Sequence, residues 1–233
     1  MQHIMSRSLA CLLTAAACAS PAGTVPRSPL APDSAATSAS STEYLVDTAS
    51  SEVNIQVYSD GLLARFGHNH VMTCRSLQGR VRVDSAWPHI AFDLSFPVDE
   101  LIVDDVQERA AADNELFPPN LTSADRAGTR KNMLGPAVLD AQRFPLVTLS
   151  SVRASGSPQS PHFSVLVTIR NVSRETPVDA QVTLAGSRLR ATGEFDIMQS
   201  DFGIEPFSVG LGALRISDRL HIRFAVEAQA PGS

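Results

Sequence analysis

Cysteine is scarce in this chain, and the scarcity limits how the fold can be stabilised. Of the 3 cysteines among 233 residues, Cys11 and Cys18 lie near the N-terminus and Cys74 lies alone in the rest of the sequence. A lone cysteine cannot form an internal disulfide, so the stability of the folded part must come from its core. Apolar residues make up 43% of the chain, which is enough to build a sizeable core.

Basic clusters and the common catalytic signatures are also missing. The formal charge of −5 is spread along the chain, without the basic patches and interleaved aromatic residues that bind nucleic acid. No Ser/His/Asp order, glycine-rich phosphate loop or nucleotide fingerprint occurs in a suitable context. His70 and Cys74 would lie about 13 Å apart on one strand, too far for a hydrogen bond. We therefore predict that the protein binds no nucleic acid, is not an enzyme and needs no cofactor.

A long hydrophobic run is absent as well. The apolar stretch Leu9–Cys18 has about ten residues, too few to span a bilayer. It follows Arg7 and ends in small residues, which is typical of an export signal over residues 1–18. Its end also resembles a bacterial lipobox, so Cys18 is a candidate lipidation site, and plain secretion is the alternative. We predict a periplasmic protein, anchored to the membrane as a lipoprotein if Cys18 is modified and otherwise secreted.

The next segment differs in composition from the rest. Residues 19–42 are mostly serine, alanine, proline and threonine with little charge, a composition that predicts a disordered tether. From residue 43 to 230 the dominant period is two, as in Ile90–Val98 and Leu214–Val226. Strict alternation with intervening turn signals predicts half-buried antiparallel strands. The expected fold is all-β, a single antiparallel barrel or sandwich.

One segment departs from this alternation. Thr122 or Ser123 is a candidate N-cap and Gly135 a candidate C-terminal residue, so one short helix is predicted around 122–135. Its basic residues Arg126 and Arg130 share one face, which either is solvated or contacts an anion or a partner. The helix would interrupt the barrel without changing its class.

The interior of such a barrel can be either filled or hollow. A barrel of about eight strands is just wide enough to hold one slender ligand. Small residues at expected inward positions, Ala180, Ala191 and Gly193, favour some remaining volume. A filled core, which would suit a non-catalytic scaffold domain, is the alternative.

Two histidines stand close together in the run Gly61–Val71. On one strand His68 and His70 would point to the same face, about 6.6 Å apart. Three interpretations remain open: a structural pair, a polar contact with the head group of a ligand, or two ligands of a metal ion. Residues before the pair predict that it faces inward and residues after it predict the opposite, so we expect a β-bulge at Gly67 or Gly79.

Four segments in order resemble the YceI family of exported, lipocalin-like proteins. They are Tyr44–Asp47 with Ser51–Ile55, Phe144–Pro145, Val167–Val178 and Asp201–Ile204, and the resemblance extends from Tyr44 to Ala228. It implies a single antiparallel lipocalin-like β-barrel, commonly dimeric, that binds a polyisoprenoid chain for storage or carriage. Gly67–His70 departs from the family pattern.

The resemblance leads to the main functional hypothesis, an exported carrier that holds an apolar isoprenoid-like lipid in the barrel. The alternative is a periplasmic metal-binding or redox-associated module that uses His68 and His70. The expected ligand-binding residues are aromatic, aliphatic and imidazole side chains near or inside the barrel, namely Phe66, His68, His70, Phe92, Leu94, Phe96, Val167, Phe195 and Phe224.

Overall fold

The computed structural model describes residues 41–112, 115–118, 120–210 and 213–232. The predicted export signal and Cys18 lie outside these residues, as does nearly all of the predicted tether; Ser41 and Thr42 already belong to the first strand. The described strands are β1 (Ser41–Val46), β2 (Glu52–Asp60), β3 (His70–Cys74), β4 (Gln78–Asp84), β5 (Ile90–Pro97), β6 (Ile102–Val103), β7 (Leu146–Gly156), β8 (Pro161–Ile169), β9 (Val172–Ala185), β10 (Arg188–Met198), β11 (Ser208–Val209) and β12 (Leu214–Gln229).

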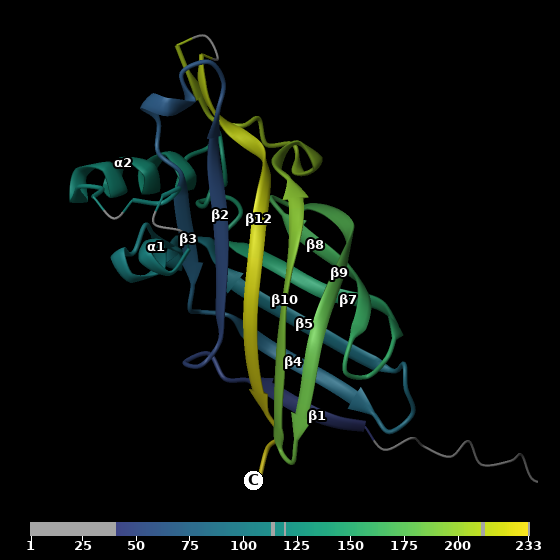
Figure 1. Ribbon diagram of the computed structural model, residues 1–233. Coiled ribbons are helices and arrows are strands. Elements are labelled where there is room, and N and C mark those ends of the chain that lie inside the picture. The colour runs from purple at the N-terminus through teal and green to yellow at the C-terminus, as the bar shows by residue number, and fades with distance from the viewer. Residues whose placement is uncertain (1–40, 113–114, 119, 211–212, 233) are drawn as a thin grey trace, which may run out of the picture. The chain divides into compact units, whose positions relative to one another are not determined.

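Among the described strands, eight close into an antiparallel barrel in the order β1, β4, β5, β7, β8, β9, β10, β12, with β12 pairing back to β1. Figure 1 shows β12 running in front between β2 and β10. The C-terminal end of β12 pairs with β1, while Arg215–Ala225 pairs with β2, so β12 also begins the extension β2–β3–β6. The predicted all-β barrel is confirmed.

The expected bulge near the histidines is wrong. β2 and β3 pair in unbroken register from Val53↔Cys74 to Val57↔His70, and β4 and β5 pair without interruption through Gly79. Gly79 has a φ of +139°, and a Cβ there would lie 2.1 Å from the carbonyl oxygen of Asp93. This glycine therefore permits a close approach between β4 and β5, and the described register shifts occur elsewhere, in β7 and β12.

The inward-facing positions change from even in β3 to odd in β4, and this change has a simpler cause than a bulge. β3 pairs with β2 and β6, whereas β4 pairs with β1 and β5. Residues 75–77, which are outside any strand, carry the chain from one pairing to the other. His70 and Met72 consequently face the cavity at even positions, and Leu77 and Val81 face it at odd positions.

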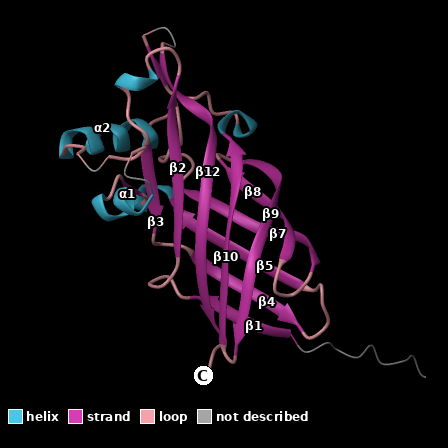
Figure 2. Ribbon diagram, viewed as in Figure 1, coloured by secondary structure: helices cyan, strands magenta, loops and turns pink. Residues whose placement is uncertain are grey.

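The described residues contain two α-helices, both beside β3 in Figure 2. The predicted helix is α2 (Ser123–Leu134), and Thr122 forms a capping box with Asp125. The second, α1 (Val106–Ala112), was not predicted, because a helix of 7 residues is too short to show a clear helical period. In the described part of the chain, no helix is long and apolar enough to cross a membrane.

Candidate ligand-binding cavity

A cavity of about 610 Å³ lies within the described domain and is lined mostly by apolar side chains. The walls include inward residues of β5, β8, β9, β10 and β12. Ala180 and Ala191 line it, as expected, but Gly193 adds no volume, because a Cβ there would lie 2.7 Å from the ring of Phe224. The nine side chains predicted to bind a ligand, which all lie in this wall, are Phe66, His68, His70, Phe92, Leu94, Phe96, Val167, Phe195 and Phe224. Their contact with a ligand stays a prediction.

The cavity is long as well as apolar. Along β12 its wall extends from Leu214 to Val226, which corresponds to about 40 Å at the rise of a strand. A volume of about 610 Å³ spread over that length leaves room for a slender chain and not for a compact molecule. The volume is typical of sites that enclose one small ligand, which occupy about 300–1,000 Å³.

Polar groups gather at one end of this cavity. Ser59 lies near the end of β2, His70 pairs with Val57 at the start of β3, and Arg215 pairs with Asp60 near the start of β12. α2 adds Asp125 and Thr129 to the lining. The cavity thus has an apolar length and a polar end.

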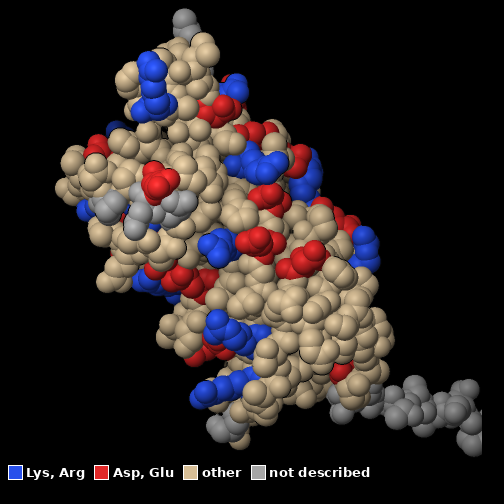
Figure 3. All heavy atoms as spheres, in the orientation of Figure 1, with Lys and Arg blue, Asp and Glu red and all other residues tan. Residues whose placement is uncertain are grey.

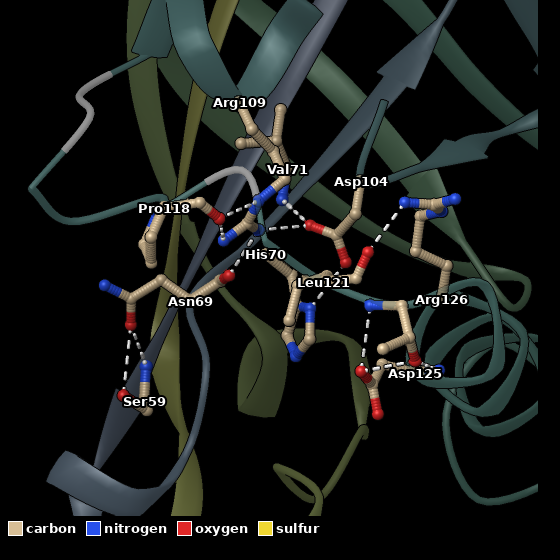
Figure 4. Close-up of polar contacts among 11 residues, drawn as sticks. Ser59, Asn69, His70, Val71, Asp104, Arg109, Pro118, Leu121, Asp125 and Arg126 are labelled. Atoms are coloured by element: carbon tan, nitrogen blue, oxygen red, sulfur yellow. Dashed lines mark hydrogen bonds and ion pairs between the residues drawn. The ribbon is translucent and has the colours of Figure 1, made fainter. Parts of the chain in front are cut away.

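A buried ion pair supports the imidazole of His70 at this end (Figure 4). Nδ1 of His70 lies 2.7 Å from Oδ2 of Asp104, whose side chain is 0% exposed. The other carboxylate oxygen accepts from the backbone amide of Val71 at 3.0 Å and from Nη1 of Arg109 at 2.5 Å. Arg109, in α1, is 1% exposed and also donates to the carbonyls of Asn69 and Pro118. α1 thus brings Arg109 to the start of β3, and its Glu108 also accepts from Asn54 and Arg75.

The chain around Asp104 is shaped for this contact. Asp104 directly follows β6 and has a φ of +53°, a left-handed conformation in which aspartate is enriched. Its backbone amide donates to the carbonyl of Val71 while its carboxylate accepts from the amide of the same residue. Asn69 supports the start of β3 on the other side, since its Oδ1 accepts from the amide and hydroxyl of Ser59.

The ionised carboxylate of Asp104 determines which ring nitrogen of His70 donates a hydrogen bond. Burial raises the pKa of the Asp104 carboxyl, but the hydrogen bond and charge of His70, with the hydrogen bonds from Val71 and Arg109, lower it by more. The pKa therefore lies below its ordinary value, and Asp104 is an ionised, acceptor-only group at neutral pH. Nδ1 of His70 must then be the donor, which leaves Nε2 as an acceptor when the imidazole is neutral.

His68 reaches the cavity wall by a different route. The chain forms a 3₁₀ helix over Ala64–Phe66, and β3 begins only at His70, so the expected single strand carrying both histidines is wrong. A Cβ at Gly67 would lie 2.8 Å from Cδ1 of Leu214, which shows how closely the chain passes β12 before His68. The hydrogen bonds from Thr122 lower the pKa of the Asp125 carboxyl, and the charge of His68 adds to this effect.

With this geometry in place, comparison with known proteins identifies the family. The model of the YceI-like domain matches residues 44–228. The chain belongs to the YceI-like domain family. Its fold is similar to that of BcnA from Burkholderia cenocepacia, at 16% identity and a TM-score of 0.57, over 79% of this chain and 99% of BcnA. The YceI protein of Campylobacter jejuni is a weaker match, with 14% identity, a TM-score of 0.47, and coverage of 66% of this chain and 81% of that one. No curated protein matches the sequence.

The metal hypothesis gains little from the geometry of this YceI-like domain. A carboxylate bonded to the second nitrogen of an imidazole is common around metal-binding histidines. Among the described residues, however, no group of three or more histidine, cysteine, aspartate or glutamate side chains is placed to hold an ion. A role of His68 and His70 as metal ligands stays a prediction.

The two arginines of α2 donate to backbone carbonyls. Arg126 donates to the carbonyl of Leu121, and Arg130 donates to the carbonyls of Leu101 and Asp99. These side chains hold α2 against neighbouring loops of the YceI-like domain, an arrangement that neither a solvated face nor an anion site describes.

Sequence reasoning also missed Asp104 and Arg109. Both lie in the acidic segment between Leu101 and Pro119, and neither has a helical or strand period around it. The available signal was a lone arginine in a short alanine-rich segment shortly after two aspartates. That signal indicates a local charge pair, but it does not indicate that His70 joins it from another strand.

Proposed function

We propose that this YceI-like domain is an exported carrier that holds one apolar, isoprenoid-like lipid in its barrel. The observation that carries the proposal is the apolar cavity of about 610 Å³, which follows β12 for about 40 Å. A long chain buries apolar surface along its whole length in such a space, whereas a compact ligand would leave much of the wall uncovered. The family match adds support for a binding role.

A carrier role also suits the chemistry of the described residues. Cys74, the nucleophile of highest intrinsic reactivity in this part of the chain, is fully buried. Burial raises the pKa of its thiol, and a protonated thiol is a poor nucleophile. The proposal is therefore a binding protein and not an enzyme.

The proposed location is the periplasm, with lipidation of Cys18 as a membrane anchor. Support for this comes from the apolar stretch Leu9–Cys18 and the small residues that end it. A carrier of membrane lipids gains from such an anchor, because it stays close to the source of its ligand. Mass spectrometry of the mature N-terminus tests the anchor: a diacylated Cys18 is expected, and an unmodified N-terminus beyond it would leave plain secretion.

Extraction of the native protein tests the carrier proposal. Protein purified without detergent is extracted with organic solvent and the extract is analysed by mass spectrometry. We expect about one isoprenoid-like lipid per chain. The proposal fails if the extract holds no lipid and delipidated protein takes up no added polyprenol.

A matched pair of variants in β10 links the lipid to the cavity. Ala191 lines the cavity, and the adjacent Thr192 does not. Ala191→Phe should reduce the bound lipid severalfold by filling the channel, while Thr192→Phe should leave it unchanged. Equal lipid content in the two variants would place the lipid outside the barrel.

Sedimentation of the same samples tests the homodimer that the family resemblance implies.

A further inference from the structure

The polar end of the cavity presents a ring nitrogen that no described protein group occupies. Nδ1 of His70 is bonded to Asp104, and no described protein group is bonded to Nε2. The side chain of His70 is 14% exposed and lines the cavity. In Figure 4 the outer nitrogen of the ring points away from the carboxylate and carries no dashed line. A donor on a ligand can therefore meet this nitrogen from the cavity.

We infer that Nε2 of His70 is the recognition point for the head group of the ligand and selects an uncharged hydroxyl, as in an isoprenoid alcohol. This inference rests on the proposed carrier function. In the neutral imidazole Asp104 holds the proton on Nδ1, so the atom facing the cavity accepts a hydrogen bond and an O–H group donates one. An ether or a hydrocarbon end offers no donor and leaves Nε2 unsatisfied.

The surrounding charges argue against an anionic head group. Arg109 is bonded to Asp104 and to the carbonyls of Asn69 and Pro118, beneath the strand. Arg126 and Arg130 donate to backbone carbonyls.

Two further charges at the polar end lead to the same conclusion. Arg215, which lines the cavity, is paired with Asp60. The carboxylate of Asp125 lies in the same wall. A phosphate or carboxylate head group would therefore meet a negative charge and find the nearby arginines already paired.

The position of His70 also suits an amphiphile with one polar end. Val57 faces His70 across the β2–β3 pair, and the inward residues that follow along both strands, Ile55, Val53 and Met72, are apolar. A ligand whose hydroxyl reaches Nε2 can place its chain along this apolar wall and on toward Ile222 and Phe224 of β12, which pair with Ile55 and Val53.

The test compares three probes with the same chain: geranylgeraniol, its methyl ether and geranylgeranyl monophosphate. Each displaces a fluorescent apolar probe from delipidated protein. We expect the alcohol to bind about three- to tenfold more tightly than the ether, and the monophosphate to bind more weakly than the alcohol. Equal binding of alcohol and ether, or tighter binding of the monophosphate, overturns the inference.

Two variants assign the preference to one atom. His70→Asn places an amide nitrogen where Nδ1 lies and keeps the donor to Asp104, but it removes Nε2. We expect the preference for alcohol over ether to fall to about one, with the affinity for the ether unchanged. His70→Gln keeps a polar group near the position of Nε2 and should retain part of the preference. A preference that survives in His70→Asn overturns the inference.

His221→Asn is the matched control. Like Nδ1 of His70, Nδ1 of His221 is bonded to a carboxylate oxygen, that of Asp196 at 2.9 Å, but His221 does not line the cavity. This variant should keep the preference of the original protein. The two hypotheses fail differently: if none of the three probes binds, the carrier proposal fails, whereas binding without discrimination overturns only the role of His70.

Discussion

The two ends of the cavity are built in different ways. The apolar length is made by alternating residues on many strands, and no single one of them carries a specific polar contact. The polar end depends on His70, Asp104 and Arg109, and each of these has a specific partner. A wall of equivalent residues tolerates change at one position, whereas a buried charge that loses its partner has no substitute.

On the outer surface, charged side chains are solvated, unlike those of Asp104 and Arg109 at the polar end of the cavity. Acidic and basic residues mingle over the face in Figure 3. Ion pairs such as His162 with Asp179 are solvated there, in contrast to the pair of Asp104 with Arg109. The buried pair and the solvated pair should therefore contribute very different free energies to stability.

The largest effect is expected from Asp104→Ala, which leaves the guanidinium of Arg109 buried without its carboxylate. The free energy of unfolding should fall by about 3–5 kcal/mol, measured by urea denaturation. Asp179→Ala removes the exposed partner of His162 and should change it by less than about 1 kcal/mol. Similar losses in both variants would remove the distinction between buried and surface pairs.

A smaller effect is expected in the apolar wall. Val165 in β8 is 2% exposed and faces the cavity, and its neighbour Leu166 points outward. Val165→Ala should lower the free energy of unfolding by about 2 kcal/mol, and Leu166→Ala by less than about 1 kcal/mol. A larger loss for the outward leucine, in the same urea experiment, would contradict the observed facing of β8.

The pH dependence should report on the polar end. The pKa of the Asp104 carboxyl is lower in the folded protein than in the unfolded chain, so the folded state favours the ionised form. Its contribution is therefore fully present above the unfolded value, about 3.9, and is lost as the pH falls through the folded value.

Comparison with Asp104→Asn isolates that contribution. The free energy of unfolding of the original protein should fall more steeply below about pH 4 than that of the variant. Parallel curves for the two proteins would show that Asp104 titrates alike in the folded and unfolded states. The exposed carboxylates of Asp60 and Asp125, whose pKa values are also lowered, remain in both proteins and cancel.

The smallest effect concerns reactivity. Cys74 is buried and the pKa of its thiol is raised, so iodoacetamide at pH 8 should modify it in unfolded protein and hardly at all in native protein. Peptide mapping distinguishes Cys74 from Cys11 and Cys18. Rapid modification in the native state would mean that β3 opens locally.

The barrel was predictable because its evidence is local and repeated. Alternation in segments such as Ile90–Val98 marks strands without knowledge of their partners, and Thr122 with Asp125 marks the start of α2. The closure of the sheet into a barrel could not be predicted from local sequence, because it depends on the pairing of Leu45 with Gln229 from the opposite end of the domain. The family resemblance supplied that step.

The polar end was only partly predictable, since its contacts join distant segments. The sequence drew attention to His68 and His70, and both do line the cavity. It assigned them one strand because nothing local reveals that Gly67 passes close to Leu214. Nor does the linker sequence reveal that Asp104 binds a histidine of another strand while holding Arg109 from the following helix.

β12 has a consequence for the size of the cavity. Its inward residues form one wall of the apolar length, its start pairs with β2 beside the polar end, and its last residues pair with β1. A shift of one residue would turn the whole row outward and disrupt both pairings at once, so the register is firmly held. The length of the cavity from His70 to its apolar end is therefore set by the register of β12 and should not vary between molecules.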